Sequence, residues 1–184
     1  MKSLGILGAG TMGAGIAYTA LTSGYTVTLV DRTADLAERG RATVAKLFAT
    51  AIGRGRATQA DADAALAALT TSGELTAFAT VPFVIEDAGV KRDTLRLLDG
   101  VCGPDTIFAS NTSTFPITEL AAASVRPDRV VGMHFFNPPY AMKLVEVIRG
   151  FHTTDAVMAT ATQIATDLGK TPIEVQDSPC FVAN

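Results

Sequence analysis

Short apolar runs alternate along this chain with longer segments in which apolar residues recur at helical spacing. The runs at 3–8 and 26–30 predict buried strands, and the stretch 11–23 between them predicts a helix. A strand, a helix and a second strand in this order form a βαβ unit, whose two strands lie parallel. The N-terminal part of the chain is therefore predicted to be an α/β sheet.

One longer helical segment interrupts this alternation, which then resumes. Residues 34–70 are rich in Ala, Leu, Arg and Asp, and Gly53 and Gly55 divide them into two predicted helices. Because such a pair is longer than a usual crossover, we expect an arm that projects from the sheet. Further strands are expected near 82–86, 106–109, 129–135, 143–148 and 171–175, and helices near 89–101, 116–123 and 155–168. Asp155 is the predicted N-cap of the last helix, and Gly169 is its predicted stop.

The composition excludes several classes of protein and several kinds of binding partner. The 184 residues are 48% hydrophobic and 18% charged with a net charge of −3, which fits one folded domain over 1–184. The sequence has no block of basic residues, so nucleic acid is not an expected partner. Cys102 and Cys180 lack CxxC spacing, so we expect neither a metal site nor a disulfide scaffold, and a cytoplasmic location suits them. We expect no membrane span, because no apolar run approaches ~18–20 residues, and we interpret the apolar N-terminus as a strand and not as a signal peptide.

The residues after the first strand form the motif Gly8-x-Gly10-x-x-Gly13, which opens the predicted helix. In this setting Gly8 permits a tight turn, Gly10 lets a pyrophosphate approach the backbone, and Gly13 lets the helix pack on the strand. The second strand ends in Asp31, 21 residues after Gly10, where a carboxylate would bind the adenosine ribose and repel a 2′-phosphate. This favours NAD over NADP, although the neighbouring Arg32 could hold a 2′-phosphate. The alternative is a glycine-rich turn that binds no ligand.

A histidine and a glutamate stand inside apolar runs that look suited to burial. His134 lies in the strand predicted near 129–135, and Glu146 lies in the strand predicted near 143–148. If these strands form a hairpin centred on Tyr140, the two side chains lie directly opposite each other with Cβ atoms about 5 Å apart. A carboxylate in that place would orient the imidazole and favour its protonated form, as in other catalytic sites. The alternatives are a hairpin of another register and a structural histidine satisfied by the backbone.

Small polar side chains follow the strand predicted near 106–109. Ser110, Asn111, Thr112 and Ser113 stand in a row at its carboxyl end, which is where open α/β sheets bind ligands. They could bind a nicotinamide carboxamide, a ribose or a substrate oxygen. The alternative is that Ser113 or Thr114 caps the next helix, a role that could coexist with binding.

Four segments together resemble a known family. They are GILGAGTMGAGIA, FASNTS, GMHFFNPPYAMKLVEVI and DSPCFVAN, and they resemble the NAD-binding domain of L-3-hydroxyacyl-CoA dehydrogenases, including 3-hydroxybutyryl-CoA dehydrogenases. The resemblance runs essentially from end to end. It implies a Rossmann-type, doubly wound, mainly parallel α/β fold, NAD as cofactor, and interconversion of an L-3-hydroxyacyl-CoA with the 3-ketoacyl-CoA.

The resemblance also assigns roles to residues of this sequence. By it, His134 is the catalytic base, Glu146 is its carboxylate partner, Ser113 hydrogen-bonds the 3-oxygen of the substrate, and Asn184 is the active-site asparagine. The expected cofactor-binding residues are Gly8, Gly10, Thr11, Met12, Gly13, Asp31, Arg32, Glu86, Lys91, Asn111, Ser113 and Asn137. Arg41 and Lys46 on the helical arm are possible partners for a substrate phosphate.

The sequence departs from the family pattern in two places. Before EDAGVK, either Pro82 occupies the place of a glutamate or four residues are missing, and the deletion is favoured because proline is unusual in a central strand. The family also continues after this asparagine into a helical domain that closes the cleft and forms most of the dimer interface, whereas this chain stops at Asn184. A homodimer is therefore expected if the full protein contains that domain.

Two other functions remain open. The same scaffold could act on an acyl-carrier-protein thioester or a sugar acid, since the acyl-CoA contacts are not specified by the motifs. A non-catalytic NAD-binding protein is the second alternative, but it would not need Ser113, His134, Glu146 and Asn184 together.

Overall fold

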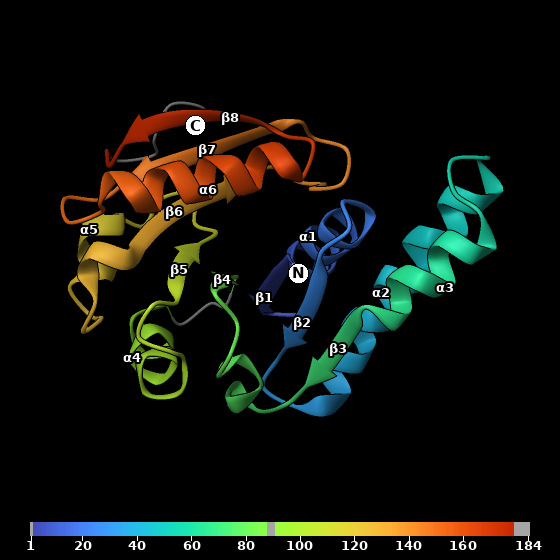
Figure 1. The fold of residues 1–184 in the computed structure, drawn as a ribbon, viewed down its shortest axis with the longest axis horizontal. Helices are drawn as coiled ribbons and strands as arrows, with labels where there is room; N and C mark the ends of the chain where they lie inside the picture. The colour runs from blue at the N-terminus through green and yellow to red at the C-terminus, as the bar shows by residue number, and fades with distance from the viewer. Residues whose placement is uncertain (1, 88–90, 179–184) are drawn as a thin grey trace.

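The protein is built around one eight-stranded sheet with the strand order β3-β2-β1-β4-β5-β6-β7-β8 (Figure 1). The structure is a computed structural model, and it describes residues 2–87 and 91–178. The strands are β1 Ser3–Leu7, β2 Thr26–Val30, β3 Leu69–Ser72, β4 Phe83–Glu86, β5 Ile107–Ser110, β6 Val130–Phe135, β7 Leu144–Arg149 and β8 Thr171–Gln176. The helices are α1 Thr11–Thr22, α2 Ala34–Gly53, α3 Gln59–Ala67, α4 Lys91–Val101, α5 Ile117–Ala121 and α6 Asp155–Asp167, with 3₁₀ turns η1 Leu75–Phe78 and η2 Pro127–Arg129.

The sheet is parallel except between β6 and β7, which pair antiparallel. From β1 the chain proceeds outward through β2 and β3, and then returns to the other side of β1 with β4. The strand order reverses between β1 and β4, and such a reversal opens a ligand-binding crevice at the carboxyl ends of the strands. The predicted Rossmann-type, doubly wound fold is confirmed.

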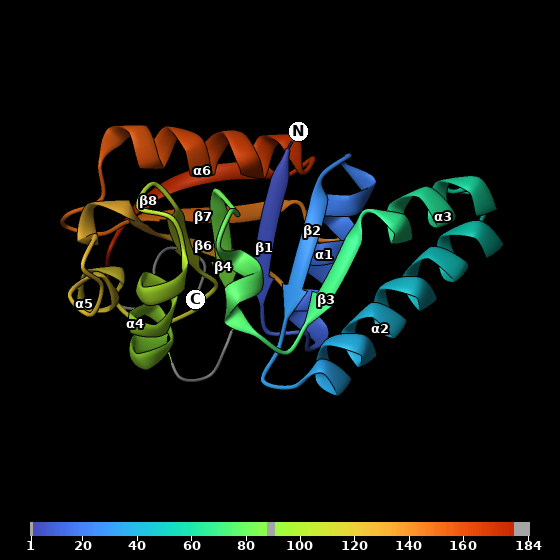
Figure 2. The same ribbon diagram turned by 60° about the horizontal axis from the view of Figure 1, so that its bottom comes forward.

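Helices cover both faces of the sheet because successive strand residues point to opposite sides. Leu4 and Ile6 of β1 belong to a buried cluster with residues of α1 and α6, whereas Leu7 belongs to a second cluster with residues of α4 and α5. Figure 2 shows α6 above the end of the sheet formed by β6, β7 and β8. These two apolar cores hold the strand ends that form the candidate site.

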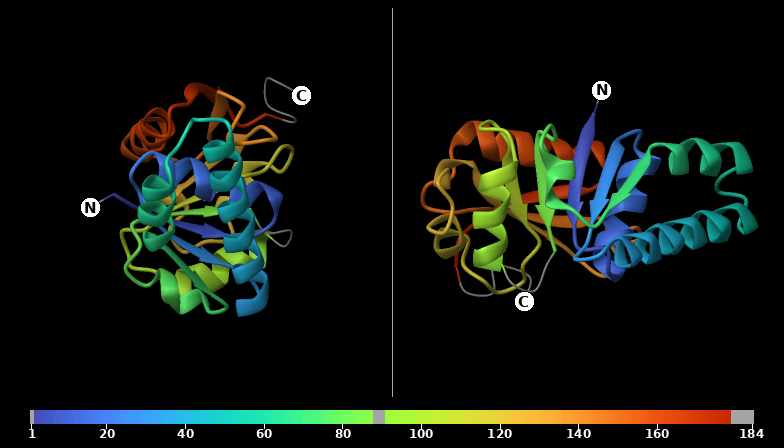
Figure 3. Two further views of the ribbon diagram at one scale, coloured as in Figure 1. Left: turned by 90° about the vertical axis from the view of Figure 1, so that its right-hand side faces the viewer. Right: turned by 90° about the horizontal axis from the view of Figure 1, so that it is seen from below.

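The predicted arm consists of α2 and α3, which extend beyond the sheet (Figure 3). Thr33 caps α2, and Thr58 and Asp61 form a capping box at the start of α3, so both helices begin with satisfied backbone amides. The guanidinium of Arg41 donates hydrogen bonds to the carbonyl oxygens of Leu69 and Leu66, at 2.6 and 2.9 Å. Arg41 therefore ties the arm to β3 through backbone contacts, while Lys46 is exposed.

Three details differ from the sequence analysis. The strand β3, formed by Leu69–Ser72, was not predicted, because only its first residue is a buried apolar side chain. Pro82 lies just before β4, where its carbonyl oxygen accepts a hydrogen bond from Ile107, so no proline interrupts this central strand. The N-cap of α6 is Thr154 and not Asp155, since the Thr154 hydroxyl accepts the Val157 amide. Gly169 ends this helix region with a positive φ of 70°, as predicted.

Candidate active site

The glycine-rich loop between β1 and α1 has the geometry of a dinucleotide cradle. Gly8 has φ +104°, and a Cβ on Gly13 would lie 1.8 Å from the Gly8 carbonyl oxygen, so both positions require glycine. A Cβ on Gly10 would meet nothing within 4 Å, which leaves space for a ligand against the backbone. Gly10 is also the N-cap of α1 and offers no side chain to the helix amides. The loop and the helix start therefore fit a dinucleotide pyrophosphate.

Asp31 stands at the end of β2 beside this loop. Its Oδ2 accepts the Ala9 amide at 2.7 Å, and its Oδ1 accepts the Arg32 amide at 2.7 Å. Each carboxylate oxygen can accept more than one hydrogen bond, so Asp31 keeps capacity for ribose hydroxyls. Arg32 and Thr11 are exposed, and Met12 packs partly against the core. The position of the Asp31 carboxylate fits the predicted selection of NAD.

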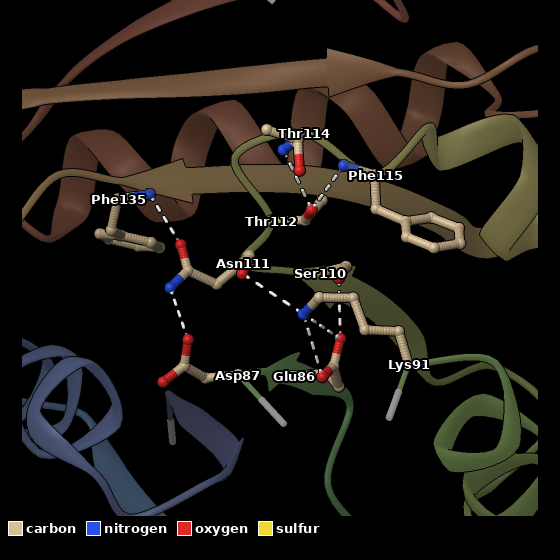
Figure 4. A network of polar contacts seen from close by, with 9 residues as sticks. All are labelled: Glu86, Asp87, Lys91, Ser110, Asn111, Thr112, Thr114, Phe115 and Phe135. Atoms are coloured by element: carbon tan, nitrogen blue, oxygen red, sulfur yellow. Dashed lines mark hydrogen bonds and ion pairs between the residues drawn. The ribbon is translucent and has the colours of Figure 1, made fainter. Parts of the chain in front are cut away.

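Glu86 forms a buried ionic centre at the carboxyl end of β4 (Figure 4). Its side chain is 1% exposed, and the Lys91 ammonium lies 3.1 Å from Oε2 and 3.2 Å from Oε1. The Ser110 hydroxyl donates a third contact to Oε2, at 2.7 Å. Lys91 begins α4 and Ser110 ends β5, so this carboxylate joins three elements at the edge of the crevice. Two of the predicted cofactor contacts, Glu86 and Lys91, are thereby brought together.

Asn111 follows β5 and links the ends of the two neighbouring strands, β4 and β6 (Figure 4). Its Oδ1 accepts the Phe135 amide at 2.9 Å, and its Nδ2 donates to Asp87 Oδ1 at 2.8 Å. Asp87 follows β4 and also accepts a hydrogen bond from the Gly13 amide. Burial raises the pKa of the Asp87 carboxyl above its usual value, while the Asn111 hydrogen bond, the Lys91 charge and the Gly13 hydrogen bond act in the opposite direction. Asn111 and Asp87 thus connect the glycine loop to the strand that carries His134.

His134 and Glu146 face each other across the β6–β7 hairpin, in the predicted register. His134 Nδ1 lies 2.7 Å from Glu146 Oε2, and the two residues are 6% and 0% exposed. The His134 ring also lies against Phe136, with ring centroids 4.4 Å apart. Because Glu146 binds Nδ1, the imidazole is held in one orientation with Nε2 on the opposite edge. The predicted hairpin and the predicted pairing are both confirmed.

Ser113 is exposed in the loop that leads from β5 to α5. Neither Ser113 nor Thr114 caps α5, which is a correction to the alternative raised by the sequence. The α5 amides of Ile117 and Thr118 instead bind the carboxylate of Asp177, at 2.9 and 2.7 Å. Within the loop, the Thr112 hydroxyl accepts the Phe115 amide at 2.9 Å. Ser113 therefore lies on a turn that the Thr112–Phe115 hydrogen bond closes.

The remaining predicted residues lie apart from these contacts or cannot be placed. Asn137 is exposed where the chain leaves β6, immediately after the strand that carries His134. Asn184 and Cys180 lie outside the described residues. The sequence analysis missed Asp87 and Asp177, although each is a carboxylate just past a strand end, which is the available signal. Across 2–87 and 91–178, the helices are too short or too polar to cross a membrane.

Comparisons with known proteins agree with this geometry. The family model described as 3-hydroxyacyl-CoA dehydrogenase, NAD binding domain, matches residues 3–178. A probable 3-hydroxybutyryl-CoA dehydrogenase of Bacillus subtilis is 39% identical over 188 residues, which cover 100% of this chain and 66% of that protein. The chain therefore spans slightly less than two thirds of the length of this relative.

Two solved structures show the same architecture. The (S)-3-hydroxybutyryl-CoA dehydrogenase of Ralstonia eutropha superposes with a TM-score of 0.97 at 42% identity, covering 100% of this chain and 66% of the other. An NAD⁺-dependent 5-formyl-3-hydroxy-2-methylpyridine 4-carboxylic acid 5-dehydrogenase has a TM-score of 0.85 at 32% identity, covering 99% of this chain and 60% of the other.

Proposed function

Because this chain belongs to the 3-hydroxyacyl-CoA dehydrogenase family through its NAD-binding domain, we propose that the protein interconverts an L-3-hydroxyacyl-CoA and the 3-ketoacyl-CoA. The observation that carries the proposal is the buried His134–Glu146 pair. His134 lies next to Phe135, whose amide binds Asn111, and Asn111 in turn binds Asp87 beside the glycine loop. A structural histidine would not need a fully buried carboxylate as its partner beside this crevice. We also propose that residues 1–184 form one NAD-binding domain, with α2 and α3 as its arm.

The proposed chemistry assigns one task to each group. When bound, NAD supplies the hydride acceptor, and the chain supplies position and charge. His134 takes the proton of the 3-hydroxyl in the oxidative direction and returns a proton to the ketone in reduction. Glu146 stabilises the imidazolium that forms, and it fixes the orientation of the ring through Nδ1. In reduction, Ser113 donates to the 3-oxygen as negative charge develops there.

The family resemblance supplies further parts of the proposal. Asn184 is the proposed second group at the 3-oxygen, and Glu86, Lys91, Asn111 and Asn137 are proposed to line the cofactor together with the glycine loop, Asp31 and Arg32. The proposed substrate is an acyl-CoA thioester, and an acyl-carrier-protein thioester would use the same chemistry. A homodimer and a cytoplasmic location are further proposals, which follow from the family pattern and the cysteine usage.

A second candidate is the same alcohol oxidation on a substrate that is not a thioester. It is favoured by the 32% identity to the 5-formyl-3-hydroxy-2-methylpyridine 4-carboxylic acid 5-dehydrogenase, whose name indicates a pyridine substrate. A sugar acid belongs to this same class of possibilities. Turnover of a pyridine alcohol or a sugar acid in preference to 3-hydroxybutyryl-CoA would select this candidate.

The test is NADH oxidation with acetoacetyl-CoA, together with NADH binding measured by fluorescence. We expect His134→Ala to lower kcat roughly 10²- to 10⁴-fold, because the proton donor is lost. Glu146→Gln keeps the shape but not the charge, so we expect a smaller loss with NADH affinity unchanged. The matched control is His152→Ala, since His152 is the other histidine and is exposed. NADH binding by a protein that turns over neither thioesters nor other alcohols would contradict an enzymatic role.

A further inference from the structure

Asp87 places a second acidic group next to the loop that is proposed to hold the dinucleotide. Its backbone continues the pairing of β4 with β1, since its amide donates to the Leu7 carbonyl oxygen at 2.8 Å. A Cβ on Gly8 would lie 3.2 Å from the Asp87 carbonyl group. The Asp87 side chain therefore starts within van der Waals reach of the glycine loop, at the switch point of the sheet.

The carboxylate of Asp87 acts as a cap for α1 that comes from outside the helix. Gly10, the N-cap residue, has no side chain, and Asp87 accepts the Gly13 amide in the first turn. Its Oδ1 accepts the Asn111 amide at 2.8 Å, and its other oxygen points away from Asn111 (Figure 4). This first helical turn is also the one whose amides and positive dipole end would hold a pyrophosphate. A carboxylate and a diphosphate would thus share one helix terminus.

The charges around Asp87 do little to offset the repulsion between its carboxylate and a bound diphosphate. The elements packed around Asp87 carry Glu86 at the end of β4, Lys91 at the start of α4 and Asp31 at the end of β2. The ammonium of Lys91 is already held 3.1 Å from Glu86. The glycine loop, residues 8–13, contains no charged side chain, and Asn111 from β5 is neutral. Like charges in such a partly buried site repel each other with little screening.

We propose that Asp87 sets the dinucleotide affinity of this site by opposing the pyrophosphate with its negative charge, so that cofactor binding takes up a proton at this carboxyl. The inference rests on the proposed NAD binding and adds to it a residue that limits affinity. The sign follows from linkage: a bound anion favours the neutral form of a neighbouring carboxyl, so affinity rises as the pH falls through the titration of Asp87. The Asn111 and Gly13 contacts hold the carboxyl in place in either state.

The experiment compares NADH dissociation constants of the wild-type protein and Asp87→Asn over a series of pH values from about pH 8 down to the lowest pH at which both remain folded. Asparagine keeps the size and one acceptor oxygen but removes the charge. We expect the variant to bind NADH roughly three- to tenfold more tightly at about pH 8, from the repulsion of unit charges a few ångströms apart. We also expect the wild type to gain affinity as the pH falls along this series and the variant to gain less. The matched control is Asp105→Asn, because the Asp105 side chain is 88% exposed and pairs with Arg129.

Equal or weaker NADH binding by Asp87→Asn at about pH 8 would overturn the inference, as would an equal gain in Asp105→Asn. A second measurement needs no change at Asp87: calorimetric titration of NADH in buffers of different ionisation enthalpy gives the protons taken up on binding. We expect net uptake by the wild type and by His134→Ala in the lower part of this pH series, and an absence of uptake in both throughout the series would also overturn the inference. A wild-type protein that binds no NADH would instead refute the proposed cofactor, and this inference with it.

Discussion

At the scale of single residues, the ion pair between Glu86 and Lys91 is a largely buried charged contact. The two side chains are 1% and 16% exposed, so removing the cation leaves a carboxylate where water cannot replace it. We expect Lys91→Met to lower the free energy of unfolding by about 3 kcal/mol, measured by urea denaturation at neutral pH.

The neighbouring residue provides the control for this prediction. Arg92 pairs with Glu119 at 2.6 Å, but both side chains are more than half exposed, at 53% and 55%. We expect Arg92→Met to change the free energy of unfolding by less than about 1 kcal/mol, because solvent screens the pair. Similar losses in the two variants would mean that burial does not govern the Glu86 pair.

At the scale of elements, Asp177 fastens the short helix α5 to the end of β8. Its two carboxylate oxygens accept the amides of Ile117 and Thr118, and the Thr118 hydroxyl donates to Oδ2 at 2.5 Å. We expect Asp177→Ala to destabilise the protein by about 1–2 kcal/mol, because the partly buried amides at this helix start lose their acceptor. Chemical denaturation checks this, with Asp155→Ala as the control, since Asp155 is 97% exposed and begins α6 without being its N-cap. Equal effects would refute the anchoring role.

The elements also show what the sequence could and could not predict. The His134–Glu146 register followed from the sequence because a hairpin centred on one residue fixes every pair across it. Strand β3 was missed because it is short and mostly polar, and its place is set by pairing with β2. The contacts of Asp177 and Asp87 join residues 60 and 24 positions apart, so they depend on the arrangement of the whole sheet and not on a local pattern.

At the scale of the whole molecule, the end of α6 meets the start of the chain beside β2. Asp167, which ends α6, accepts hydrogen bonds from Lys2 at 2.5 Å, Tyr25 at 2.8 Å and Gln163 at 2.9 Å. The hydrogen bonds from Lys2, Gln163 and Tyr25 lower the pKa of Asp167 to about 2 from 3.8. The Tyr25 hydroxyl has a raised pKa, because it is buried and donates to this carboxylate.

The lowered pKa of Asp167 means that this link between α6 and the start of the chain weakens in acid. A carboxyl whose folded-state pKa lies below its unfolded value adds stability above the unfolded value, and that contribution disappears as the pH falls through the folded value. We therefore expect Asp167→Asn to be less stable than the wild type at pH 7, with the difference shrinking between about pH 4 and about pH 2. Thermal unfolding of both proteins across this range measures the difference. A gap that stayed constant down to about pH 2 would mean that the carboxylate charge is not what holds α6 to the start of the chain.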